Sequence, residues 1–325
     1  MKDIRFFLDS YLEKPAVWSI IFLYAFYCEG VICVIEIIDL TQVYRSGKGV
    51  FDLNFTINNG EVFGYLGPNG AGKTTTIRNI LGFTNASKGK VLINGLDARI
   101  ETEEINKTIG YLPGEIALYK NLRGREFLDL LASLRNLTDF TFRKELEEKF
   151  KLETEVYIKK MSKGMKQKLA IIACFMHDPD ILILDEPTSG LDPLMQNIFL
   201  DLIKEEKKRK KTILLSSHIF EEVERVCDRV GIIKDGYLIA LEDIHTIKQK
   251  TADMFEIYLE EKDDLILKSG LDISYIRDNI YHVAVKSNYK EFFKVMQEFK
   301  VTKINSFKES LEDLFMKYYG DDQNE

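Results

Sequence analysis

The feature that most constrains the fold of this 325-residue chain is a glycine-rich loop at residues 67–74, which reads Gly-Pro-Asn-Gly-Ala-Gly-Lys-Thr. The loop follows an apolar strand predicted at 61–66 and precedes a short helix predicted at 74–81. Glycines allow a backbone to close around a phosphate group, and the amides at a helix start point at its oxygens. This order of strand, loop and helix predicts an α/β domain that binds the phosphates of a nucleotide.

Two side chains at the end of the loop carry the predicted chemistry. Lys73 is expected to reach the β- and γ-phosphates, and the Thr74 hydroxyl is placed to bind Mg²⁺. The loop as a whole supplies the predicted nucleotide-binding residues Gly67, Asn69, Gly70, Ala71, Gly72, Lys73, Thr74 and Thr75.

A second apolar strand, predicted at 181–184, ends in two consecutive carboxylates. The carboxyl edge of the strands is where α/β sheets bind ligands, so both side chains are expected beside the phosphate loop. Asp185 is the predicted Mg²⁺ ligand, and Glu186 is the predicted group that orients or deprotonates an attacking water.

The rest of the chain falls into segments of different pattern. Apolar strands predicted at 181–184, 212–216 and 230–233 favour a buried parallel sheet, interrupted by a helical section at about 115–165. After residue 241 the strands become half-buried, which predicts a small C-terminal α+β domain at 242–325 without a chemical motif. Its expected elements are strands at 255–259, 280–285 and 301–307 and helices at 289–299 and 310–319.

The charge and cysteine content exclude several classes of protein. The formal net charge is −7 and the isoelectric point is about 5.4, so nucleic acid is not an expected partner. The basic run at 204–211 is interpreted as a solvated helix face. The four cysteines lack the spacing of a zinc site or a disulfide framework, which favours a reducing compartment.

Residues 1–33 form an N-terminal extension with an apolar run at 16–28, too short for a spanning helix of about 20 residues. Three hypotheses stay open. The segment is an extra amphipathic helix packed on the domain, or it is an anchor that touches a membrane. In the third hypothesis it is not translated, because codons for residues 29–31 can contain a ribosome-binding sequence and Val34 can be a GTG start.

A further motif narrows the class of nucleotide-binding protein. The sequence Met161-Ser-Lys-Gly-Met165 resembles the LSGGQ signature of ABC transporter nucleotide-binding subunits. Its serine and second glycine match, whereas Lys163 and Met165 depart from the pattern. The resemblance implies that Ser162 and Gly164 cover the γ-phosphate of an ATP molecule bound to a second subunit.

Other positions agree with this resemblance. It implies that Tyr44 stacks on adenine, that Asp192 belongs to the loop crossing the dimer interface, and that His218 is the switch histidine at the γ-phosphate. The family's Mg²⁺-contacting glutamine is replaced by Gly114, which Glu115 follows. Either Glu115 substitutes for it, or the subunit couples to its membrane partner differently.

The resemblance covers about residues 35–240 and implies a P-loop NTPase fold for the segment 34–241. That fold has a mostly parallel core sheet, antiparallel edge strands and a helical signature subdomain. The implied function is that of a stand-alone ATPase subunit of a bacterial export system for antibiotics or drugs. It would use ATP and Mg²⁺ on the cytoplasmic face of the membrane, with a separate permease and a second copy or homologous subunit. The alternatives are an ATP-binding regulatory module with little hydrolysis and an ABC ATPase that acts on ribosomes or DNA.

Overall fold

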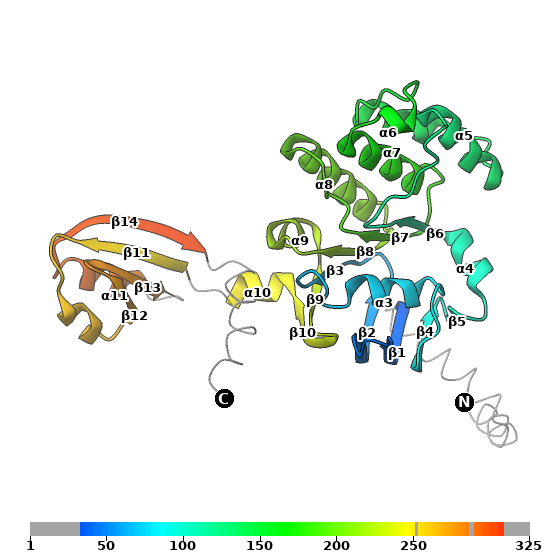
Figure 1. Ribbon diagram of the computed structural model, residues 1–325. Coiled ribbons are helices and arrows are strands. Elements are labelled where there is room, and N and C mark those ends of the chain that lie inside the picture. The colour runs from blue at the N-terminus through cyan, green and yellow to red at the C-terminus, as the bar shows by residue number, and fades with distance from the viewer. Residues whose placement is uncertain (1–32, 251–252, 286–288, 309–325) are drawn as a thin grey trace, which may run out of the picture.

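The computed structural model describes residues 33–250, 253–285 and 289–308 (Figure 1). A six-stranded sheet forms the centre of residues 33–250, with strand order β10-β9-β3-β8-β7-β6. All neighbouring strands are parallel except the β9–β10 pair at one edge. The strands are β3 (Val62–Leu66), β6 (Ile109–Leu112), β7 (Ile181–Asp185), β8 (Thr212–Ser217), β9 (Arg229–Lys234) and β10 (Tyr237–Asp243).

One face of this sheet is covered by α3 (Lys73–Ile80) and by a smaller antiparallel sheet. The smaller sheet has the order β2-β1-β4-β5. Alternate residues of the central strands point to this side, and Phe63 of β3 stacks on Phe55 of β2 at 5.2 Å between ring centroids. The remaining bounds are β1 (Cys33–Val43), β2 (Gly49–Asn58), β4 (Lys88–Ile93), β5 (Leu96–Asp97) and α4 (Thr102–Thr108).

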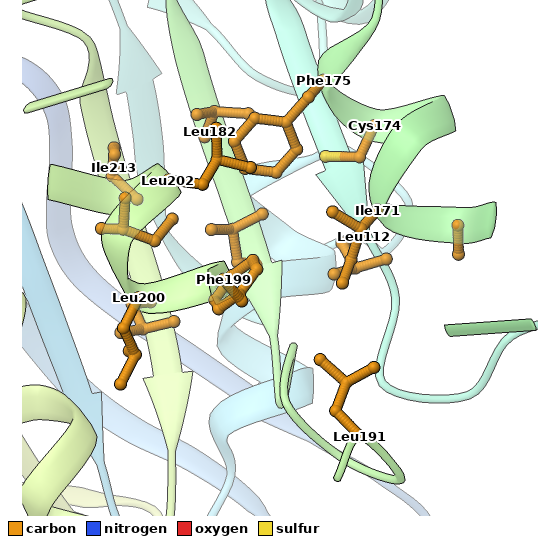
Figure 2. Packing of buried hydrophobic residues seen from close by; sticks show 14 of the residues in the cluster. Leu112, Ile171, Cys174, Phe175, Leu182, Leu191, Phe199, Leu200, Leu202 and Ile213 are labelled. Carbon is orange, nitrogen blue, oxygen red and sulfur yellow. The ribbon is translucent and has the colours of Figure 1, made fainter. Parts of the chain in front are cut away.

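The opposite face of the central sheet is covered by helices. Figure 2 shows Phe199 and Leu202 of α8 beside Leu182 and Ile213, which belong to β7 and β8. The same buried cluster continues into the helical section between β6 and β7, so that section shares a core with the sheet. Its helices and those that follow are α5 (Gly124–Leu134), α6 (Thr141–Lys149), η1 (Ile158–Lys160), α7 (Lys163–Phe175), α8 (Pro193–Lys208) and α9 (Phe220–Val226).

The expected mostly parallel core with antiparallel edge strands is confirmed, but several element ends differ. Within the helical section expected at about 115–165, α5 ends at Leu134, and Asn136 just beyond it has a φ of +53°, which cannot continue an α-helix. The basic run 204–211 is not wholly solvated, because Glu206 and Lys211 are buried. Arg209 pairs with Glu206, and Lys211 pairs with Asp180, so part of the run anchors the end of α8.

Beyond α10 (Ile244–Lys250), a four-stranded antiparallel sheet with the order β12-β13-β11-β14 has its own apolar cluster. Ile257, Tyr281 and Phe292 are fully buried in that cluster. The elements are β11 (Asp253–Leu259), η2 (Asp264–Lys268), β12 (Asp272–Arg277), β13 (Ile280–Val285), α11 (Tyr289–Met296) and β14 (Val301–Lys308). The helix expected at 310–319 and the apolar run at 16–28 lie outside the described residues.

A search of the described residues for membrane spans gives a negative result. Within residues 33–250, 253–285 and 289–308, every helix is too short or too polar to cross a bilayer.

Candidate functional site

The glycine-rich loop joins β3 to α3 and is held against the strands beneath it. Gly72 has a φ of +115°, and a Cβ at this position would lie 2.6 Å from Val50 Cγ1. A Cβ on Gly67 would lie 2.5 Å from the carbonyl oxygen of Ile233. Both positions therefore require glycine, one for its left-handed backbone and both for close approach.

Lys73 begins α3, and its side chain turns back over the loop. The Lys73 ammonium donates to the carbonyl oxygens of Gly67 at 2.5 Å and of Pro68 at 3.3 Å. The residue is buried, yet it borders an open cavity of about 160 Å³. The cavity is lined by Pro68, Asn69, Gly70, Gly72, Lys73, Thr74, Thr75 and Glu186.

The two predicted carboxylates contact the last two residues of this loop. The Thr74 hydroxyl donates to Asp185 Oδ2 at 2.8 Å, and the Ser216 hydroxyl donates to Asp185 Oδ1 at 2.5 Å. Lys73 Nζ lies 3.0 Å from Glu186 Oε1. Glu186 follows β7 with a φ of +50°, an uncommon conformation for a residue with a side chain, at the edge of the cavity.

His218 completes a chain of charged and polar groups. Its Nδ1 lies 2.6 Å from Glu186 Oε2, so the Glu186 carboxylate bridges Lys73 on one side and His218 on the other. His218 follows β8, which neighbours β7 in the sheet, and the parallel register brings the two strand ends together. A carboxylate that lies this close to a phosphate loop can take a proton from a water there, and the role of Glu186 as that base stays a prediction.

The predicted signature lies on α7, away from this cavity. Ser162 caps the helix, since its hydroxyl accepts a hydrogen bond from the Met165 amide at 3.2 Å. A Cβ on Gly164 would lie 3.0 Å from the Gly190 carbonyl oxygen. One turn later, Gln167 Nε2 donates to the Pro187 carbonyl oxygen at 2.6 Å in a buried contact. These contacts fasten the start of α7 to the loop that follows Glu186.

Gly67 and Ala71 of the loop do not line the cavity. Neither do the four predicted nucleotide-binding residues from elsewhere in the described chain: Tyr44, Ser162, Gly164 and Asp192. Tyr44 lies in the turn after β1 and is 38% exposed. Asp192 caps α8, with its Oδ1 accepting from the Met195 amide at 3.0 Å. The roles of these four residues in binding adenine or a second copy's nucleotide stay predictions.

The loop after β6 borders the Asp185 carboxylate. A Cβ on Gly114 would lie 3.4 Å from Asp185 Oδ2, which is ordinary contact and leaves room for a side chain. Glu115 is exposed. Burial and the nearby Asp185 carboxylate raise the pKa of Tyr111 to about 12, so the phenol at this edge of the site stays protonated at neutral pH.

Comparison with known proteins bears directly on this site. The family model described as ABC transporter matches residues 50–189, which include the glycine-rich loop, the signature helix and both carboxylates. The chain is 36% identical over 310 residues to the uncharacterized ABC transporter ATP-binding protein YhcH of Bacillus subtilis (strain 168). That alignment covers 90% of this chain and 98% of YhcH. The chain belongs to the family of ABC transporter ATP-binding proteins.

Two further comparisons agree with this assignment. The bacitracin transport ATP-binding protein BcrA of Bacillus licheniformis is 35% identical, with 88% of this chain and 97% of BcrA covered. A solved ATP-binding subunit of an ABC transporter superposes with a TM-score of 0.62 at 33% identity. That match covers 67% of this chain and 92% of the solved one. The chain is thus an ATP-binding subunit of the ABC class, whose activity is ATP hydrolysis.

The structure of this ABC ATPase adds two groups that the sequence analysis did not single out. Ser216 holds Asp185, and the buried Gln167 holds the loop after Glu186. Both contacts join residues more than 15 positions apart, so no local motif contains them. The sequence feature that could have indicated Ser216 is its place at the end of an apolar strand, just before Ser217 and His218.

Proposed function

We propose that this ABC ATPase drives export of small molecules through a separate membrane-spanning permease, bound to it at the cytoplasmic face of the membrane. The observation that carries the proposal is the Lys73–Glu186–His218 arrangement at the edge of the phosphate cavity. The similarity to BcrA over nearly its full length supports transport of a compound of the antibiotic class.

The geometry provides a sequence of events at the γ-phosphate. The Lys73 ammonium lies 3.0 Å from Glu186 Oε1. An arriving γ-phosphate competes for the ammonium, and the released carboxylate is then free to accept a proton from an attacking water. His218 keeps the carboxylate oriented through its hydrogen bond to Oε2. ATP binding itself thereby prepares the base for hydrolysis.

The residues beside the loop fit a bound Mg²⁺ ion. Mg²⁺ prefers hard oxygen ligands and is commonly held by one or two protein groups together with phosphate oxygens and waters. The Thr74 hydroxyl and the Asp185 carboxylate already lie 2.8 Å apart, beside the phosphate loop. The ion would neutralise charge on the β- and γ-phosphates, and Ser216 would keep the Asp185 carboxylate oriented.

Replacing Asp185 with Asn tests this metal assignment. The amide keeps the size of the side chain but removes the charge that attracts a cation. We expect the Mg²⁺ concentration for half-maximal ATPase activity to rise at least tenfold, about 1.4 kcal/mol. Binding of ATP in EDTA should change little. Asp201→Asn on the exposed face of α8 is the matched control. An unchanged Mg²⁺ titration of Asp185→Asn would contradict the assignment.

Two copies are proposed to act head to tail. In the described residues, Ser162, Gly164 and Asp192 are absent from the lining of the Lys73 cavity of their own chain. Ser162 and Lys163 are instead exposed at the positive end of the 13-residue helix α7. A phosphate bound at Lys73 of one copy would then also lie against Ser162 and the positive end of α7 of the other copy.

Mixing two inactive variants tests this arrangement. Lys73→Met removes the phosphate-binding cation, whereas Ser162→Asp retains a good helix cap and places a negative charge where the phosphate would lie. A mixed pair then holds one doubly defective site and one intact site. We expect an equal mixture to recover up to about a quarter of wild-type ATPase activity, because half of random pairs are mixed. A mixture no more active than either variant alone would argue against sites shared between copies.

The permease is proposed to dock in the groove beside the Gly114 loop. This groove, about 250 Å³ in volume, has a largely apolar lining. It is bordered by Tyr111 and Pro113 from the strand and loop before Gly114, and by Phe127 and Leu131 of α5. An apolar cytoplasmic segment of the permease would bury this surface. The same loop borders Asp185, which would connect the contact to the nucleotide site.

A further inference from the structure

Glu222 is a buried carboxyl group that the proposed chemistry does not use. It is the third residue of α9, in the segment that follows His218, and is 5% exposed. Buried carboxylates are costly unless they are hydrogen-bonded, so the contacts of this group identify what it holds in place.

The first contact fixes the two residues that flank His218. The Ser217 hydroxyl donates to Glu222 Oε2 at 3.1 Å. The same hydroxyl oxygen accepts from the Ile219 amide at 2.9 Å. Because the hydroxyl proton is directed at Glu222, the oxygen lone pairs face the amide. The direction of the hydrogen bond that joins Ser217 and Ile219, on either side of His218, therefore depends on the Glu222 carboxyl group.

The second contact reaches the other partner of His218. The Thr188 side chain also lies close to Glu222 and lowers the pKa of its carboxyl group. Thr188 is buried two residues after Glu186, and its carbonyl oxygen accepts from the Leu191 amide at 3.0 Å. One carboxyl group therefore connects the loop after β7 with the loop after β8. These are the two loops that bring Glu186 and His218 within 2.6 Å of each other.

We propose that Glu222 is a positioning residue that aligns the Glu186–His218 pair for hydrolysis by holding Ser217 and Thr188. This inference rests on the proposed function of that pair. Glu222 does not line the phosphate cavity, and its hydrogen bond with Ser217 connects it to the backbone at His218. Removing it should disturb the rate of hydrolysis and leave the binding of ATP nearly intact.

The ionisation of Glu222 distinguishes a positioning role from a role in stabilising the fold. Burial raises the pKa of Glu222, and the nearby Glu186 carboxylate raises it further, against the Thr188 and Ser217 side chains, which lower it. A carboxyl group whose pKa is raised on folding is ionised at neutral pH at a cost in stability. Glutamine has the same shape without that cost, but its amide reverses the hydrogen-bond polarity toward one hydroxyl.

The decisive variant is Glu222→Gln, measured in the full chain with Glu221→Gln as the matched control from the adjacent exposed position. We expect Glu222→Gln to lower kcat for ATP about 10- to 100-fold, the loss typical of a misplaced catalytic group. KM for ATP should stay within about twofold, and the melting temperature should be equal to or above that of the wild type. Glu221→Gln should leave all three quantities unchanged.

A second variant keeps the test valid if Glu222→Gln folds poorly. Ser217→Ala removes the hydroxyl between Glu222 and Ile219, and we expect a similar loss of kcat. The double variant should lose no more than the larger single loss, because the two residues act as one unit. A wild-type kcat in Glu222→Gln or Ser217→Ala, or additive losses in the double variant, would overturn the inference.

The Glu186→Gln variant separates this inference from the proposed function. If Glu186→Gln is inactive while Glu222→Gln and Ser217→Ala turn over normally, only the role of Glu222 fails. If Glu186→Gln itself turns over normally, the proposed hydrolytic site fails and the inference fails with it.

Discussion

Replacing Glu186 with Gln is expected to abolish nearly all ATP turnover while ATP binding is retained. The side chain lies at the edge of the phosphate cavity, paired with Lys73 and His218, and no other carboxylate among the described residues lines that cavity. An amide cannot accept the proton of an attacking water. Loss of a general base typically lowers the rate about 10²- to 10⁴-fold.

The same variant should accumulate a closed pair of chains. Without hydrolysis the nucleotide stays between the phosphate loop and the second copy, so size-exclusion chromatography with light scattering in ATP and Mg²⁺ should show dimers. Phosphate release measures the rate, and a fluorescent ATP analogue measures binding. Asp201→Asn on the exposed face of α8 is the control. Turnover by Glu186→Gln at the wild-type rate would remove this residue from the catalytic role.

Lys73→Met is expected to fail earlier, at the binding step. The Lys73 ammonium is buried, is held by two loop carbonyl oxygens and balances the Glu186 carboxylate. Without it, an uncompensated negative charge lies beside the phosphates. Truncating one partner of a buried charge pair typically costs about 2–5 kcal/mol, so the Kd for ATP should rise by roughly two orders of magnitude.

Isothermal titration with ATP and Mg²⁺ measures this loss of affinity. Lys90→Met, on an exposed position of β4, controls for the change of a lysine to an apolar side chain. The melting temperature of both variants should be compared without nucleotide, where the wild type gains nothing from binding. ATP affinity within threefold of the wild type would show that the backbone of the loop, and not Lys73, provides the binding energy.

The ATP hydrolysis rate and the cellular fraction of the unmodified protein distinguish the proposed transport function from its two alternatives, a regulatory module and an ATPase that acts on ribosomes. A regulatory module would bind ATP but release little phosphate, even when its permease is present. An ABC ATPase that acts on ribosomes would sediment with ribosomes and not with membranes. The Lys73–Glu186–His218 arrangement favours hydrolysis over both, since a binding module needs no oriented base beside the phosphates.

The parts of the site that the sequence predicted are those encoded in short contiguous segments. The glycine-rich loop and the strand ending in Asp185 and Glu186 each combine local conformation with chemistry, so their pattern is sufficient. The contacts from Ser216 to Asp185 and from Gln167 to Pro187 depend on strand order and helix packing. No spacing in a single sequence specifies such pairings, and a buried Glu222 looks like any acidic helix residue until α9 is placed.

The same reasoning applies to the fold. Continuous apolar strands predicted a buried parallel sheet because both faces of such strands are covered. Element ends were harder to predict, since Asn136 at a φ of +53° and the burial of Lys211 reflect tertiary contacts over local preference. The short strands β4 and β5 of the antiparallel sheet were not predicted individually, because segments of two to six residues carry little periodicity.

The attachment of α7 to the loop after Glu186 has a consequence for energetics. In the proposed head-to-tail pair, the Ser162 end of that helix would contact its neighbour's triphosphate, and the Gln167–Pro187 hydrogen bond would couple its position to the chain's own loop after Glu186. Occupancy of one pocket then alters the free energy of the other, and thermodynamic linkage requires the effect to be mutual. The two subunits would therefore share one conformational equilibrium, and their two sites would hydrolyse ATP cooperatively and not independently.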